Sequence, residues 1–137
     1  MLAGLGFRSL WGSEDRWAEV TRVMFQTGDF VHPSINGEVY FDKPLMSYWA
    51  IALVKLVTGS LNEFAIRLPS ALGALIGLWG TIKLGSILRD EKTGYAAAWM
   101  LLSCYGFVFW GRTAAADMQN LTAIILAIAW FMMRKDK

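Results

Sequence analysis

Charged side chains that could perform chemistry are few in this chain, and they lie outside its long apolar runs. A lysine or arginine can stabilise negative charge on a phosphate leaving group, and a carboxylate can act as a general base toward a hydroxyl. The candidates are the carboxylates Glu14, Asp15, Asp42 and Asp117 and the cations Arg16, Lys43 and Arg112. Taken singly, each carboxylate also has a structural reading, as a helix cap or as the partner of a helix dipole. Together they suggest a polar site beside an apolar bundle, where charge is costly unless it has a function.

No pattern for binding a nucleotide or zinc accompanies these residues. The sequence contains neither a G-x-x-x-x-G-K-[ST] nor a G-x-G-x-x-G loop. Its one histidine, His32, and one cysteine, Cys104, do not form a group with zinc-ligand spacing. The chemistry considered above requires no cofactor, although a carboxylate cluster could hold a divalent cation through oxygen ligands.

The composition indicates a membrane protein. Of the 137 residues, 55% are apolar and only 18% are charged, against roughly a quarter charged in soluble domains. The net charge of +2 is not concentrated on any segment, which argues against a nucleic-acid partner. A single cysteine excludes an internal disulfide.

Three apolar runs are predicted to cross the membrane as helices, at residues 67–88, 94–111 and 118–133. About 20 helical residues cross a hydrocarbon core of about 30 Å. A fourth run, 44–60, is shorter and contains Lys55, whose insertion costs about 3 kcal/mol. We expect this run to be an interfacial helix; the alternative is a fourth span whose lysine extends to the surface. The first run contains a stripe of small residues, Gly73, Gly77 and Gly80. Such a stripe predicts the close approach of another helix.

Residues 13–27 are predicted to form an amphipathic helix on the membrane surface. Ser13 could cap its start and Gly28 could end it. Four apolar residues recur at helical spacing and form one stripe: Trp17, Val20, Val23 and Met24. The charged residues of the segment lie beside this stripe. The predicted fold class is therefore an all-α membrane protein with three transmembrane helices, an amphipathic surface helix and an interfacial helix.

Basic residues near the predicted spans set the orientation. The loop 89–92 and the tail 134–137 hold most of them, which places both on the cytoplasmic side. Residues 1–66 and the loop 112–117 then face outward. If 44–60 does not cross, this helix should be inclined to the others at one end of the bundle, and Asp42 and Asp117 should lie at that end. The first residues are too short to span and lack the features of a signal peptide, so we expect a fragment of a larger polytopic protein.

A series of short motifs resembles integral-membrane glycosyltransferases of the GT-C type. The similarity is greatest to the bacterial aminoarabinose (lipid A) transferases and the broader protein O-mannosyltransferase-like group. The motifs run in order from about residue 9 to the end of the chain: 14–19, 28–30, 36–37, 40–45, 48–49, 64–72 and 112–118. In the family pattern, an aspartate usually stands where this chain has Ser13, and a glutamate is more frequent at Asp42. Lys43 and Asp117 match the pattern.

The resemblance implies that a sugar on a polyprenyl phosphate is transferred to lipid A, to a protein or to another glycan. The reaction would occur on the periplasmic face of the bacterial inner membrane, in a multi-pass partial GT-C fold surrounded by membrane lipids. The implied catalytic residues are Glu14, Asp15 and Asp117, with Glu14 or Asp15 acting for the missing aspartate. The implied substrate-binding residues are Arg16, Trp17, Tyr40, Asp42, Lys43 and Arg112.

The resemblance also implies that residues 1–137 are the amino-terminal part of a longer enzyme and are inactive alone. Two alternatives stay open. One is a fragment of a transporter or flippase, whose substrate path would pass Lys55 and Asp117. The other is a non-catalytic membrane subunit.

Overall fold

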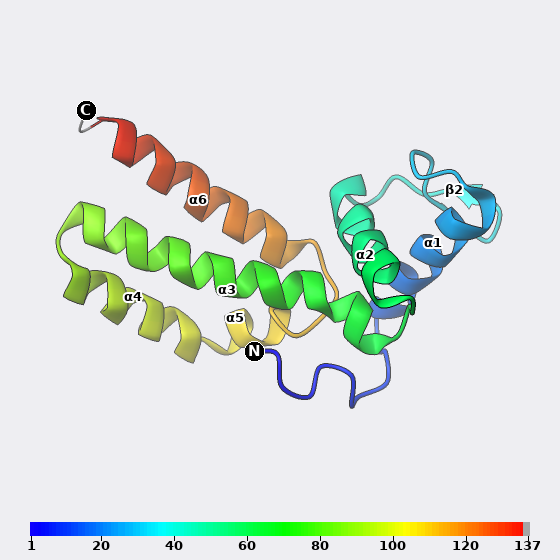
Figure 1. Ribbon diagram of the computed structural model, residues 1–137, viewed down its shortest axis with the longest axis horizontal. Coiled ribbons are helices and arrows are strands. Elements are labelled where there is room, and N and C mark those ends of the chain that lie inside the picture. The colour runs from blue at the N-terminus through cyan, green and yellow to red at the C-terminus, as the bar shows by residue number, and fades with distance from the viewer. Residues whose placement is uncertain (136–137) are drawn as a thin grey trace.

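The computed structural model describes residues 1–135 and is mostly helical (Figure 1). The helices are α1 (Glu14–Thr27), α2 (Leu45–Thr58), α3 (Glu63–Leu88), α4 (Glu91–Ser103), α5 (Tyr105–Trp110) and α6 (Asp117–Lys135). Between α1 and α2, strands β1 (Ser34–Ile35) and β2 (Glu38–Val39) pair antiparallel as a short hairpin. The prediction of an all-α architecture is confirmed in this coarse form.

Helix α3 is the central element. It runs lengthwise through the molecule with α4 on one side and α6 on the other, whereas α1, α2 and the hairpin gather at its amino-terminal end (Figure 1). The glycine stripe allows the close packing of α3 on α6, as predicted, because Thr122 lies against Gly73 and Gly77. The Thr122 hydroxyl donates a hydrogen bond to the Gly73 carbonyl at 2.7 Å. On the other side, Gly85 and Gly94 meet where α4 crosses α3.

Helix α2 lies across the end of this bundle, as the sequence predicted for residues 44–60 (Figure 1). Its Lys55 does not extend to a distant surface; the ammonium group lies 3.6 Å from the centre of the Phe25 ring on α1. The Trp49 indole donates to the Phe30 carbonyl at 2.8 Å. These contacts join α2 to α1 and the loop after it, so the three form one subdomain at the end of α3.

The prediction of one continuous helix over 94–111 is wrong. Cys104 is extended, with φ −70° and ψ 119°, and it separates α4 from α5. The Ser103 hydroxyl and the Cys104 thiol both donate to the Met100 carbonyl, which competes with the backbone pairing of a helix. Gly106 follows two residues later and lowers the helix propensity further. Among the helices of residues 1–135, α3 alone is long and apolar enough to cross a membrane by length and composition.

Candidate functional site

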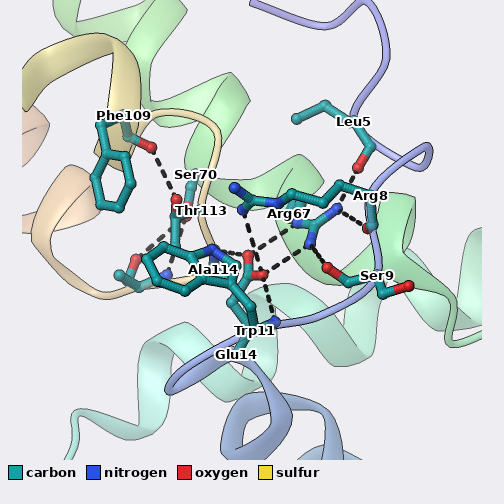
Figure 2. A network of polar contacts seen from close by, with 11 residues as sticks. Leu5, Arg8, Ser9, Trp11, Glu14, Arg67, Ser70, Phe109, Thr113 and Ala114 are labelled. Atoms are coloured by element: carbon teal, nitrogen blue, oxygen red, sulfur yellow. Dashed lines mark hydrogen bonds and ion pairs between the residues drawn. The ribbon is translucent and has the colours of Figure 1, made fainter. Parts of the chain in front are cut away.

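A buried ion pair joins the start of α1 to the start of α3 (Figure 2). The Arg67 guanidinium donates to both carboxylate oxygens of Glu14, from Nε at 2.8 Å and from Nη2 at 2.7 Å. Its other bonds go to carbonyls of the amino-terminal segment, those of Leu5, Arg8 and Ser9. The side chains of Glu14 and Arg67 are 0% and 2% exposed. The pair therefore fixes three parts of the chain to one another.

Glu14 also accepts two backbone hydrogen bonds. The Trp11 N–H donates at 3.3 Å, and the Ala114 N–H, from the loop before α6, donates at 3.0 Å. Burial pushes the pKa of Glu14 upward, but the hydrogen bonds from Arg67 and Ala114 outweigh it, so the pKa lies below its usual value. Glu14 is therefore an ionised structural group that is fully occupied by its partners.

This arrangement corrects two predictions for α1. Ser13 occupies the N-cap position but makes no capping hydrogen bond with its side chain. Glu14 does not lie beside the apolar stripe but begins the buried face, because Arg67 supplies a partner for its charge. The buried residues of α1 are Glu14, Trp17, Val20, Thr21 and Met24.

A pocket of about 340 Å³ opens beside this buried pair, between the starts of α1, α2 and α6. Its lining consists of Ser13, Arg16, Trp17, Tyr40, Asp42, Lys43, Pro44, Tyr48, Trp110, Ala115, Ala116, Asp117 and Asn120. The Trp17 and Tyr48 rings pack together, 4.7 Å between centroids, and both line the pocket. As predicted from the inclination of α2, Asp42 and Asp117 lie at the same end of the bundle, in one pocket.

A row of polar contacts runs along one side of the pocket. Arg16 Nη1 donates to the Tyr40 hydroxyl at 2.8 Å, and this hydroxyl donates to Asp42 at 2.9 Å. The Lys43 ammonium lies 3.3 Å from the same Asp42 oxygen. The hydrogen bonds from Tyr40 and Lys43 hold the pKa of Asp42 below its usual range. Burial raises the pKa of Tyr48 to about 12, so this phenol stays neutral.

The pocket unites most of the residues selected from the sequence, but not all of them. The side chains of Arg16, Trp17, Tyr40, Asp42, Lys43 and Asp117 line it. Glu14 is buried behind it, Asp15 is exposed on α1 outside the lining, and Arg112 lines a different cavity. Sequence reasoning did not select Asn120 or Trp110 as site residues. Asn120 follows Asp117 by three residues, a spacing that places both on one helix face.

The pocket holds two carboxylates, those of Asp42 and Asp117. Within residues 1–135, no three His, Cys, Asp or Glu side chains come together in a way that could hold a metal ion. The cations of the pocket are those of Arg16 and Lys43, so the site offers both positive charge and carboxylate oxygens to a ligand.

Comparison with known proteins finds one family and a set of close relatives. Residues 42–135 match the family described as dolichyl-phosphate-mannose-protein mannosyltransferase. Three relatives are named undecaprenyl phosphate-alpha-4-amino-4-deoxy-L-arabinose arabinosyl transferase; the name of the one from Sodalis glossinidius ends in the number 2. That of Pseudomonas savastanoi pv. phaseolicola is 37% identical over 109 residues, which cover 78% of this chain and 20% of the relative. That of Aeromonas salmonicida is 36% identical over 141 residues, 98% of this chain and 25% of the relative. That of Sodalis glossinidius is 38% identical over 133 residues, 93% of this chain and 23% of the relative.

The chain thus spans a quarter or less of the length of these relatives. No solved structure was found to match it.

Replacing Glu14 by Gln should destabilise the protein strongly. Removing the carboxylate leaves the Arg67 charge buried without a counter-charge, a change that costs about 3–5 kcal/mol in buried pairs. Thermal melting in detergent measures the effect. Glu19→Gln is the matched control, because the Glu19–Arg22 pair is exposed and such pairs contribute about 0–1 kcal/mol. Equal melting temperatures for the two variants would contradict the assigned role of Glu14.

The same variant should change the response to acid. Because the pKa of Glu14 is lower in the folded protein than its usual 4.5, its contribution is complete above that value. The contribution is lost as pH falls below about 4.5 and through the lowered pKa of the folded state. Wild-type protein should therefore lose more stability on acidification than Glu14→Gln does.

Proposed function

Since the chain belongs to the family of dolichyl-phosphate-mannose-protein mannosyltransferases, we propose that it forms the amino-terminal part of a membrane glycosyltransferase. The enzyme would transfer a sugar from a polyprenyl phosphate to an acceptor. The observation that carries the proposal is the pocket in which Arg16, Lys43 and Asp117 converge from three separate segments. A transporter or a non-catalytic subunit is not favoured, because the matching family and relatives are transferases.

In this proposal, Lys43 stabilises the phosphate leaving group. Departure of a lipid phosphate places negative charge on its oxygens, and a fixed cation lowers the free energy of that state. Asp42, itself held by Tyr40, orients the Lys43 ammonium toward the pocket. Arg16 supplies a second cation at the other end of the polar row.

We assign Asp117, rather than Glu14 or Asp15, as the acceptor-side carboxylate. Asp117 lines the pocket at the first turn of α6 and is exposed to it, whereas Glu14 is occupied by Arg67 and Asp15 lies outside the lining. Toward a hydroxyl acceptor, Asp117 would act as the general base. Toward a phosphate acceptor, which is already ionised, it would position the acceptor or a divalent cation.

The relatives' names suggest the donor. We propose an undecaprenyl phosphate carrying 4-amino-4-deoxy-L-arabinose, the group named in those proteins. Lipid A is the acceptor we propose first, ahead of a protein or another glycan. An apolar cavity of about 370 Å³ between α2, α3 and α6 offers space for part of a prenyl chain, and its lining includes Met46, Leu53, Ile76 and Leu126.

We also propose that α3, the α4–α5 pair and α6 cross the bacterial inner membrane, with the pocket facing the periplasm. Large aromatic side chains on the outer faces of these helices support contact with lipid. They are Trp79 on α3, Trp99 on α4 and Trp130 on α6, at 56%, 70% and 56% exposed. The break at Cys104 would then lie within the second crossing.

Lys43→Ala should reduce sugar transfer by about a hundredfold or more, the range found on removing one charge-stabilising group. The measurement is turnover in a chain that contains the whole transferase, with an undecaprenyl-phosphate sugar as donor. Lys92→Ala is the matched control, since Lys92 is an exposed lysine in the first turn of α4, at the far end of the bundle. An unchanged rate at normal expression would remove Lys43 from phosphate binding.

Single cysteines should report the proposed orientation in a Cys104→Ser background. Asn62→Cys, before α3, should react with a membrane-impermeant thiol reagent added from outside. Glu91→Cys, at the opposite end of α3 and the start of α4, should not. Labelling at position 91 but not at 62 would invert the topology.

A further inference from the structure

A second cavity, of about 210 Å³, lies on the other side of the loop that precedes α6. Its lining shares no residue with the first pocket and consists of Gly4, Leu5, Arg8, Arg67, Tyr105, Val108, Phe109, Arg112 and Thr113. Cavities for drug-sized ligands usually measure about 300–1,000 Å³, so this one suits a smaller group. Nothing in the proposed transferase chemistry uses it.

The cavity carries unbalanced positive charge. Three arginines line it. The carboxylate bonded there, Glu14, is occupied by Arg67, and the charge of Glu63 also acts on Arg67. Arg8 lies 3.7 Å from the same carboxylate, a long contact, and its side chain is 55% exposed. Arg112 donates to the Met1 carbonyl at 3.0 Å. Within residues 1–135, the contacts found leave most N–H donors of Arg8 and Arg112 without an acceptor.

Aromatic rings lie beside Arg8 and along the cavity that Arg112 also lines. The Arg8 guanidinium lies 5.2 Å from the centre of the Trp11 ring. The Trp11 ring packs edge-to-face against Phe109, and Figure 2 shows both rings together with Arg8. Tyr105 stacks on Phe109 and is 80% exposed, and Phe7, close to Gly4, is 96% exposed. Trp and Tyr side chains, here Trp11 and Tyr105, are enriched at the level of lipid headgroups in a bilayer.

From this geometry we infer that Arg8 and Arg112 bind the phosphate group of an anionic membrane lipid. Guanidinium groups present paired donors that match phosphate oxygens, and the surrounding rings would contact the adjoining glycerol and acyl carbons. The bound phosphate neutralises the charge that Glu14 does not balance. The inference rests on the proposed membrane location, but not on the proposed sugar transfer.

The test is a titration of the chain, solubilised in an uncharged detergent, with phosphatidylglycerol or phosphatidylcholine while its thermal midpoint is followed. Phosphatidylglycerol should raise the midpoint, and phosphatidylcholine should raise it much less. In a double variant, Arg8→Gln with Arg112→Gln, half-maximal stabilisation should require at least about tenfold more phosphatidylglycerol. The matched control, Arg22→Gln with Arg89→Gln, removes the same charge from exposed positions and should respond as wild type does.

Val108→Glu keeps the test decisive if the double variant does not fold. Val108 lines the cavity, so a glutamate there would supply an internal counter-charge and should remove the response to phosphatidylglycerol. Equal stabilisation by both lipids, or a full response in Val108→Glu, would overturn the inference. Equal stabilisation by glycerol phosphate would overturn the assignment to a lipid, because it would identify a site for free phosphate esters.

Discussion

The buried pair of Glu14 and Arg67 is the interaction on which the arrangement of the rest depends. Two charges removed from water are tolerated only when nearly every lone pair and proton has a partner, and here those partners come from distant segments. Arg67 binds carbonyls of the amino-terminal segment, and Glu14 binds the backbone on both sides of the interface, at Trp11 and Ala114. The pair therefore holds the start of α1 against α3 and against the loop that leads into α6.

The position of the pocket depends on this attachment of α1 to α3 and to the loop before α6. Ser13, Arg16 and Trp17 flank Glu14 on α1, so fixing Glu14 places these side chains beside Asp117. Helix α2 completes the wall because Tyr48 packs on Trp17 and Lys55 on Phe25. Ser13, which stands where the family pattern usually has an aspartate, lines the pocket. The negative charge of the pocket therefore comes from Asp42 and Asp117.

Local sequence patterns predicted most of the helices. Features that these patterns missed depend mainly on contacts between residues far apart in the chain. The bounds of α1 and α2 follow from apolar periodicity and from Gly28 and Gly59, both left-handed at the helix ends. The burial of Glu14 could not be predicted, because its partner lies 53 residues away. The break at Cys104 had only a weak signal, Ser103 and Gly106 in an uncharged run, and side-chain competition for one carbonyl decides it. Six of the nine selected site residues line the pocket. The charge of four of them, Arg16, Asp42, Lys43 and Asp117, was enough to select them, whereas Trp17 and Tyr40 were selected only through the family motifs.

Photocrosslinking tests most directly whether this pocket receives the phosphate of a polyprenyl lipid. A benzophenone amino acid at Asn120, on the pocket wall, is compared with one at Trp99, on the exposed face of α4. Undecaprenyl phosphate should crosslink at position 120, and an excess of unlabelled undecaprenyl phosphate, but not of undecaprenol, should suppress the product. Crosslinking at position 99 alone, or equal suppression by undecaprenol, would contradict a phosphate site between α1, α2 and α6.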